Sequence, residues 1–134
     1  MLPISDAEEY LKERFGAELN GEFYYNGDFW YCREPEERYE TNGIRAVRDM
    51  DIGLKPTTYF LQLIQDKIGK NKVDLSREEL EALLNGDMIE YSDLEKGYVA
   101  LFFENLCIGC GFYMDELISS RVPEGRGEEL LQTL

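Results

Sequence analysis

The sequence contains no histidine, so it lacks the side chain that enzymes most often use as a general base and as a metal ligand. Its three cysteines are too few for a four-thiolate zinc site and odd in number for a disulfide framework. Carboxylates are so abundant that no acid–base pair stands out among them. We therefore expect no catalytic residues, no bound metal and no cofactor.

Long apolar runs are also missing. No stretch approaches the roughly 18 consecutive apolar residues that a membrane-spanning helix needs. The first residues, MLPISDAEEY, have neither the basic nor the apolar region of a signal peptide. Few cysteines suit a reducing compartment. These features predict a cytoplasmic protein with no membrane partner, and 134 residues suffice for one domain or two small lobes.

Positive charge is scarce and unevenly spread. The chain carries 14 basic and 28 acidic side chains, a formal net charge of −14. Residues 45–77 hold seven basic and four acidic side chains, a net of +3, between flanks of −7 and −10. This asymmetry indicates either an anion-facing surface or, with equal weight, chance and ordinary solvation. The basic residues of this segment are Arg45, Arg48, Lys55, Lys67, Lys70, Lys72 and Arg77.

The N-terminal third predicts a helix followed by a β-hairpin. Ala7, Leu11 and Phe15 recur at helical spacing until Gly16. The sequence EFYYNGDFWY then predicts a hairpin with a two-residue turn at Asn26-Gly27. Its six aromatic side chains could stack on RNA bases, but about half of them must face a core, so packing is the favoured role.

Residues 43–69 predict a short strand and a second helix. Ile44 to Val47 form the strand, Pro56 is expected as the first helical residue, and Gly69 ends the helix. Its free N–H groups, with the hydroxyls of Thr57 and Thr58 and the neighbouring Lys55, predict a phosphate site. Simple capping by the threonines is the favoured alternative. At the other end Lys67, Lys70 and Lys72 complement the helix dipole without needing a partner.

The C-terminal half predicts one more helix and a β-meander. Ser76 and Glu79 form a capping box, and Gly86 ends that helix. Three strands follow, over residues 98–103, 107–112 and 117–122, with turns at Glu104-Asn105 and Asp115-Glu116. Strict alternation places Cys107 with Gly109 and Gly111 on one face and Cys110 on the other. The two thiols are then expected neither to pair nor to share a metal, which makes a redox protein the weakest alternative.

Several of these stretches resemble a known family. The sequence LNGDMIEYSDLEKGYVALFFENLCIGCGFY looks like a PUA-type module. Together with GIRAVR, GLKPTT and GFYMDELI, it resembles the PUA-like accessory region of the Sun-type (NOL/NOP/Sun) RNA cytosine-5 methyltransferases and its free-standing relatives, over roughly residues 10–126. The resemblance implies a β-pseudobarrel that binds structured RNA through its helix, the loop around Gly86 and the adjacent strand. The catalytic domain of those enzymes has no counterpart here, since the sequence has neither their glycine-rich cofactor turn nor their Pro-Cys pair.

The sequence thus predicts an α+β fold, with a small N-terminal α/β lobe over residues 1–70 that precedes a PUA-like β-barrel domain over residues 71–134. Its predicted function is binding of tRNA or rRNA in RNA modification or ribosome biogenesis, without a catalytic domain of its own. The alternative is an adaptor whose acidic surface docks on a basic partner, such as an RNA methyltransferase or a ribosomal protein. The candidate RNA-binding residues are Arg45, Arg48, Lys55, Thr57, Thr58, Lys67, Lys70, Lys72, Gly86, Arg121 and Arg126.

Overall fold

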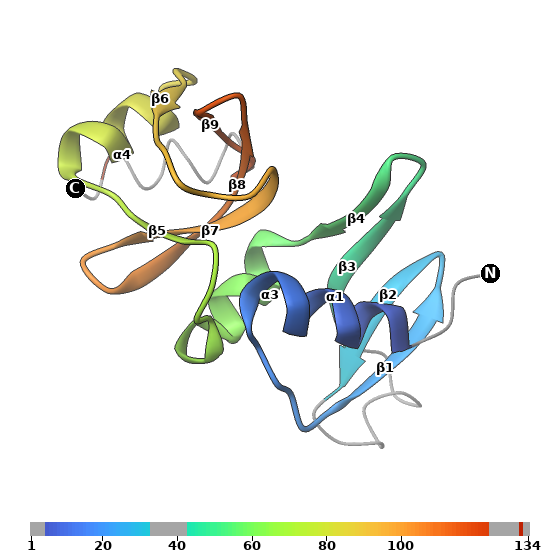
Figure 1. Ribbon diagram of the computed structural model, residues 1–134. Helices are drawn as coiled ribbons and strands as arrows, with labels where there is room; N and C mark the ends of the chain where they lie inside the picture. Colours follow the sequence, from blue (N-terminus) through green and yellow to red (C-terminus); the bar gives the residue numbers. More distant parts are fainter. Residues whose placement is uncertain (1–4, 33–42, 124–131, 133–134) are drawn as a thin grey trace. The chain divides into compact units, whose positions relative to one another are not determined.

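The computed structural model of the protein describes residues 5–32, 43–123 and 132 (Figure 1). The chain divides into two compact units, Met1–Lys70 and Asn71–Leu134. The first holds an antiparallel sheet with helices, and the described residues of the second hold a curled sheet of five strands and the helix α4. The predicted α+β fold class is therefore confirmed.

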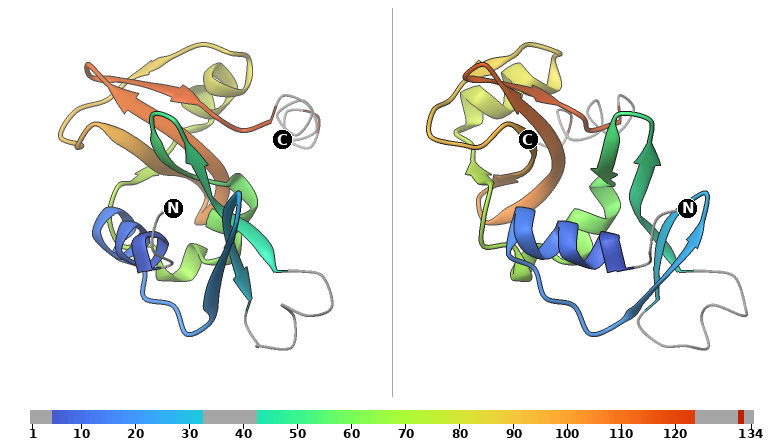
Figure 2. Two further views of the ribbon diagram at one scale, coloured as in Figure 1. Left: turned by 90° about the vertical axis from the view of Figure 1, so that its right-hand side faces the viewer. Right: turned by 45° about the vertical axis from the view of Figure 1, so that its right-hand side comes forward.

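The N-terminal unit is a four-stranded antiparallel sheet in the order β1-β2-β3-β4, so each strand lies beside its neighbour in the sequence (Figure 2). Short hairpin connections produce this order because antiparallel neighbours can be joined by tight turns. The elements are α1 (Ser5–Phe15), β1 (Glu22–Asn26), β2 (Asp28–Cys32), β3 (Ile44–Met50), β4 (Gly53–Pro56), α3 (Thr58–Leu63) and the 3-10 helix η1 (Gln65–Lys67).

One face of this sheet carries the core of the unit. Phe23, Phe29 and Tyr31 on the β1–β2 hairpin are buried. The ring of Phe60, on α3, lies with its centre 6.2 Å from that of Phe23 and 5.2 Å from that of Tyr31. Half of the six hairpin aromatics therefore face a core, as their alternation along the strands predicted.

Three local predictions in this unit were wrong. Asn26 lies opposite Asp28, so the hairpin turns about the single residue Gly27 (φ +78°) rather than about a two-residue turn. Pro56 ends β4 opposite Val47 instead of starting a helix. The last strand of a sheet tolerates proline because one row of its N–H groups has no ladder partner. The helix ends at Leu63, where η1 takes over, and so does not reach Gly69.

The C-terminal unit is built around the pair of long strands β7 and β8. The strand order is β5-β7-β8-β9-β6, with β5 parallel to β7 and the other pairs antiparallel. In Figure 2 the β7–β8 ribbon, drawn in orange, is strongly curved. The elements are β5 (Lys72–Asp74), α4 (Arg77–Leu84), β6 (Ile89–Glu90), β7 (Gly97–Phe103), β8 (Leu106–Met114) and β9 (Leu117–Ser120).

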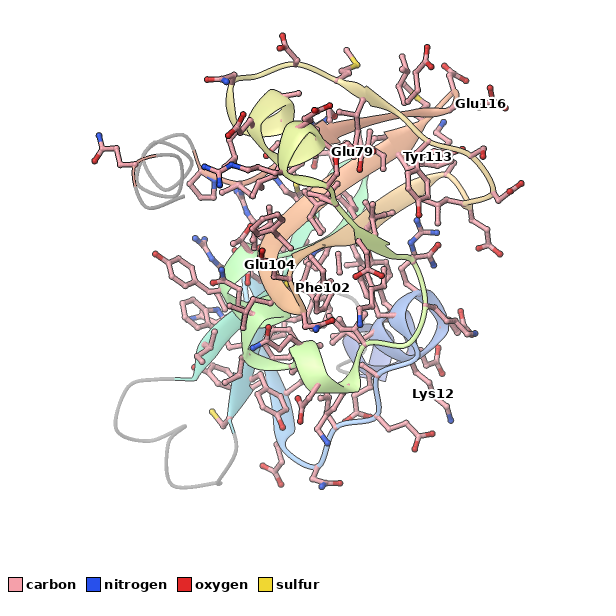
Figure 3. All side chains as sticks on the ribbon, turned by 90° about the vertical axis from the view of Figure 1, so that its left-hand side faces the viewer. Lys12, Glu79, Phe102, Glu104, Tyr113 and Glu116 are labelled. Atoms are coloured by element: carbon pink, nitrogen blue, oxygen red, sulfur yellow. The ribbon has the colours of Figure 1, made fainter. Side chains whose placement is uncertain are left out.

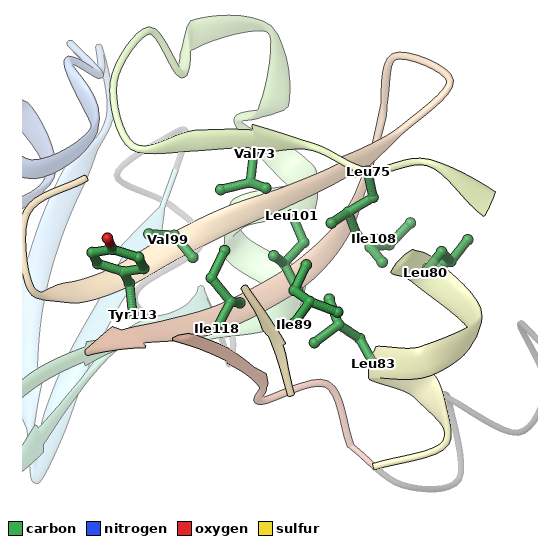
Figure 4. Close-up of a cluster of buried hydrophobic side chains, with 10 residues drawn as sticks. All are labelled: Val73, Leu75, Leu80, Leu83, Ile89, Val99, Leu101, Ile108, Tyr113 and Ile118. Atoms are coloured by element: carbon green, nitrogen blue, oxygen red, sulfur yellow. The ribbon is translucent and has the colours of Figure 1, made fainter. Parts of the chain in front are cut away.

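The predicted meander and helix are confirmed. Both turns of the meander have two residues at positive φ, between 49° and 68°, which is the geometry of a type I′ hairpin. In the capping box, Ser76 Oγ accepts from the N–H of Glu79 (3.1 Å), and Glu79 Oε1 accepts from the N–H of Ser76 (2.9 Å). Figure 4 shows the core that joins α4 to the concave side of the sheet; its members are Val73, Leu75, Leu80, Leu83, Ile89, Val99, Leu101, Ile108, Tyr113 and Ile118.

The predicted faces of β8 were wrong because of a β-bulge. Leu101 pairs with Gly109, but the next residue, Phe102, pairs with Cys107, so β8 has one extra residue at this point. A bulge of this kind interrupts alternation and places two consecutive residues on one side. Cys107 therefore shares a face with Cys110, which pairs with Ala100, instead of lying opposite to it.

Gly111 is closely surrounded. A Cβ added there would lie 3.1 Å from a methyl carbon of Leu101 and 3.1 Å from the carbonyl oxygen of Ser119. Replacing Gly111 with valine should lower the free energy of unfolding by about 1 to 3 kcal/mol through overpacking, as measured by urea denaturation. Gly69→Ala is the control, because a Cβ at Gly69 meets no atom within 4 Å. Equal stability of Gly111→Val and wild type would show that this strand is not closely packed.

The second meander turn holds Glu116 at φ 62°, a conformation that costs free energy for every residue with a Cβ. Glu116→Gly should raise the free energy of unfolding by about 0.5 to 1 kcal/mol in thermal or urea denaturation. The same exchange at exposed Glu13, inside α1, should lower it by about 1 kcal/mol. A loss of stability in Glu116→Gly would contradict the type I′ turn.

Candidate nucleic-acid interface

The strand register brings two basic residues together. Arg48 on β3 lies directly opposite Lys55 on β4. Their neighbour Asp49 faces the other side, where its Oδ2 accepts a hydrogen bond from the Tyr25 hydroxyl (2.8 Å). This hydrogen bond, with smaller contributions from desolvation and nearby carboxylates, raises the pKa of Tyr25. The acid next to Arg48 in the sequence is thus engaged on the opposite face.

A second bulge adds Arg45 to this surface. The register of β2 and β3 shifts between Phe29 and Trp30, and Ala46 and Val47 are both buried at that point. Alternation on either side of the bulge directs Arg45 and Arg48 away from the core. We call this side of the sheet the outer face. Its aromatic and basic side chains come from Tyr24, Trp30, Arg45, Arg48 and Lys55, and alternation places the acidic Glu22 and Asp28 on the same side.

Arg45 is held in place by an ion pair, but its side chain stays largely exposed. Its Nη1 lies 3.4 Å from Asp28 Oδ2, and 49% of the Arg45 side-chain surface is exposed. Asp28 is itself fixed, because its Oδ1 accepts a hydrogen bond from the N–H of Asp49 (2.9 Å). An ion pair this exposed contributes little to stability, so the guanidinium remains accessible to an anion.

The two threonines take part in local structure. Thr57 caps α3: its Oγ1 accepts from the N–H of Phe60 (3.2 Å) and donates to the carbonyl of Arg45 (2.7 Å). Thr58 is buried, with 6% of its surface exposed. The capping role expected as the alternative is therefore present, and a phosphate contact from either threonine stays a prediction.

Two further cations of the N-terminal unit lie away from the outer face. Lys67 is exposed on η1. Lys70 lies at the end of α1, because its N–H and that of Gly69 both donate to the carbonyl of Phe15. There it lines a mixed-charge pocket of about 540 Å³ with Lys12 (labelled in Figure 3) and acidic residues of α1 and of the segment that follows it, Glu9, Glu13 and Glu18.

The remaining candidates belong to the C-terminal unit. Lys72 Nζ lies 4.4 Å from the ring centre of Phe102, which is labelled in Figure 3 near the end of β7. Arg121 donates from Nη1 to Ser119 Oγ (2.8 Å) and lies over the Phe112 ring. Gly86 (φ +95°) forms the exposed turn after α4. Arg126 lies outside the described residues.

Sequence analysis considered the six hairpin aromatics for base stacking but favoured packing for them, and it did not single out Tyr59. The rings of Tyr24 and Trp30 stack on the outer face, with centres 6.4 Å apart and planes inclined by 16°. Tyr59, on α3, has 58% of its surface exposed. The sequence contained a signal for Tyr24 and Trp30, because side chains alternate along a strand and the residues next to them, Phe23, Phe29 and Tyr31, are buried.

Nothing in the described part of the chain suggests metal or thiol chemistry. Among these residues, no three histidine, cysteine or acidic side chains are grouped to hold a metal ion. All three cysteines are buried thiols, and burial raises the pKa of Cys107 to about 11. None of the described helices combines the length and apolar character needed to cross a membrane.

The curled sheet with α4 across it has the form of a PUA pseudobarrel, a class of domain that typically binds RNA. Residues 70–126 match the family model described as the methyltransferase RsmF PUA domain. This domain is one found in the Sun-family RNA m5C methyltransferases, so the resemblance read from the sequence is confirmed for residues 70–126. No catalytic family was found in the chain, and no curated protein matches it.

The buried thiols lead to a prediction about reactivity. A thiol with a raised pKa stays protonated at pH 8, and only the thiolate reacts with iodoacetamide. The raised pKa protects Cys107, and burial keeps the reagent away from Cys32 and Cys110. Native protein at pH 8 should thus be alkylated at none of the three within the time that labels all of them after unfolding, as followed by mass spectrometry. Rapid labelling of Cys107 in the native protein would revive the redox alternative.

Proposed function

We propose that this protein binds structured RNA, either tRNA or rRNA, and acts as an accessory module in RNA modification or ribosome biogenesis. The PUA family of residues 70–126 supports RNA as the ligand class. The observation that carries the proposal is the cross-strand pair of Arg48 and Lys55, with Arg45 on the same outer face.

This pair brings no evident advantage to the fold. Like charges directly opposite one another on a sheet destabilise it. Both residues are also charged side chains on a small protein that has twice as many acidic as basic groups. A polyanion bound to the outer face would turn this repulsion into attraction, since each phosphate neutralised releases counterions from the RNA.

The charge distribution restricts where RNA can approach. Residues 45–77 carry +3, and the two flanks carry −7 and −10. Charges beyond about 8 Å are largely screened at physiological salt, so a local cationic surface can bind phosphates although the whole protein is acidic. Contacts of this kind position the RNA and carry no sequence information.

The rival function is the adaptor that docks on a basic protein, such as an RNA methyltransferase or a ribosomal protein. An acidic pocket of about 570 Å³ on the C-terminal unit favours it, with Glu90, Asp115 and Glu116 in its lining. Figure 3 shows Glu116 at the tip of this unit, where it projects outward. The same titrations can separate the two functions.

Reversing the cross-strand pair should abolish most RNA affinity. In Arg48→Glu/Lys55→Glu, binding to many structured RNAs should weaken alike, because two cations that hold phosphates become anions. The slope of log K against log salt should become shallower by about 0.7 to 0.9 for each phosphate that the variant no longer neutralises. The measurement is fluorescence anisotropy with tRNA and rRNA fragments at several salt concentrations.

The matched control is Lys12→Glu/Lys96→Glu, which also changes the formal charge by four units, from −14 to −18. Because these lysines lie outside the outer face, this variant should keep nearly the wild-type slope. Equal losses in both double variants would mean that net charge and not the outer face governs binding. If wild type binds a basic protein but no RNA at low salt, the adaptor replaces the proposal.

A further inference from the structure

A small pocket opens where β3 begins and where β4 leads into α3. Its volume is about 330 Å³, at the lower end of the range for ligand pockets, which suits one small planar group. Trp30 of the outer face contributes to its wall, and Arg45 lies at its edge. The full lining is Trp30, Ile44, Arg45, Thr57 and Tyr59.

The apolar part of this lining is unusually exposed. Tyr59 has 58% and Ile44 has 40% of its surface exposed. The indole of Trp30 is fixed by its stack with Tyr24, so it presents a pre-ordered aromatic wall. Rigid aromatic surfaces of this kind bind planar groups with little loss of conformational entropy.

The polar groups around the pocket divide into satisfied and unsatisfied ones. The Thr57 hydroxyl and the Arg45 carbonyl are used by each other and by the cap of α3. By contrast, Trp30 Nε1 is buried and has no hydrogen-bond partner among the described residues. This nitrogen has almost no exposed surface, so a group bound in the open pocket meets the face of the indole and not its N–H.

We propose that this pocket receives an unpaired nucleobase of the bound RNA. Tyr59 and Trp30 supply the stacking surface. The base belongs to a nucleotide whose phosphate is close to Arg45, with Arg48 and Lys55 farther along the same face. This assignment rests on the proposed RNA-binding function and adds that the RNA presents a single-stranded loop or bulge.

A nucleobase suits these groups better than a protein side chain does. The pocket combines aromatic walls with an adjacent guanidinium, and a nucleotide joins a planar ring to an anion in the same way. An apolar side chain would bring no anion to the Arg45 guanidinium.

The test uses the fact that Trp30 is the single tryptophan of the chain, so its fluorescence reports on this pocket alone. The probes are an RNA hairpin with an adenine-containing loop and the same hairpin with abasic loop nucleotides. The first should quench the Trp30 fluorescence and bind about tenfold more tightly, the range expected for one stacked base. The abasic hairpin should bind through phosphates without quenching.

Two variants of Tyr59 keep the test independent of folding, because this side chain is exposed. Tyr59→Leu should reduce the affinity for the adenine loop to that for the abasic loop, whereas Tyr59→Phe should retain the difference. Circular dichroism checks that both are folded. Unchanged affinity in Tyr59→Leu would overturn the assignment of the base to this pocket.

The two proposals fail in different ways. If both hairpins bind equally without quenching, and Arg48→Glu/Lys55→Glu still abolishes binding, RNA binding stands and the base pocket is wrong. If neither hairpin binds at low salt, both proposals are overturned.

Discussion

One extra residue in each sheet decides which side chains this protein presents. In the N-terminal sheet the bulge at Ala46 and Val47 buries two consecutive residues opposite Phe29. In the C-terminal sheet the bulge at Ile108 places Cys107 and Cys110 on one face. A β-bulge shifts every later side chain to the other side relative to strict alternation. The position of Arg45 beside Trp30 and the burial of both thiols depend on these two shifts.

Burial then separates structural from functional side chains within the same hairpin. Phe23, Phe29 and Tyr31 fill the core, while Tyr24 and Trp30 remain on the outer face together with the basic residues. Helices cover one side of this small sheet. Arginine and lysine are rarely buried, so the basic residues lie on the other side, where a ligand could reach them. The proposed interface thus combines cations for phosphates with aromatic rings for a base, on strands that the core holds rigid.

The C-terminal unit contributes a different kind of information. The PUA family model that residues 70–126 match suggests RNA as the ligand class. The core between α4 and strands β7, β8 and β9 explains why the module folds. Lys72 and Arg121 lie there over aromatic rings, an arrangement that orders a cation without removing its charge. Their role in RNA binding stays a prediction, as does that of Gly86.

The sequence by itself determined the features that arise from neighbours a few residues apart. It predicted the capping box at Ser76, the meander with its turns at Glu104 and Asp115, the burial of half the hairpin aromatics, and the α+β class. Only the tertiary structure decided the pairing of Arg48 with Lys55, the shared face of the two thiols and the pocket at Trp30 and Tyr59. Strand register and bulges are set by packing between distant segments, and an extra residue in a strand leaves no periodicity or composition that a sequence can reveal.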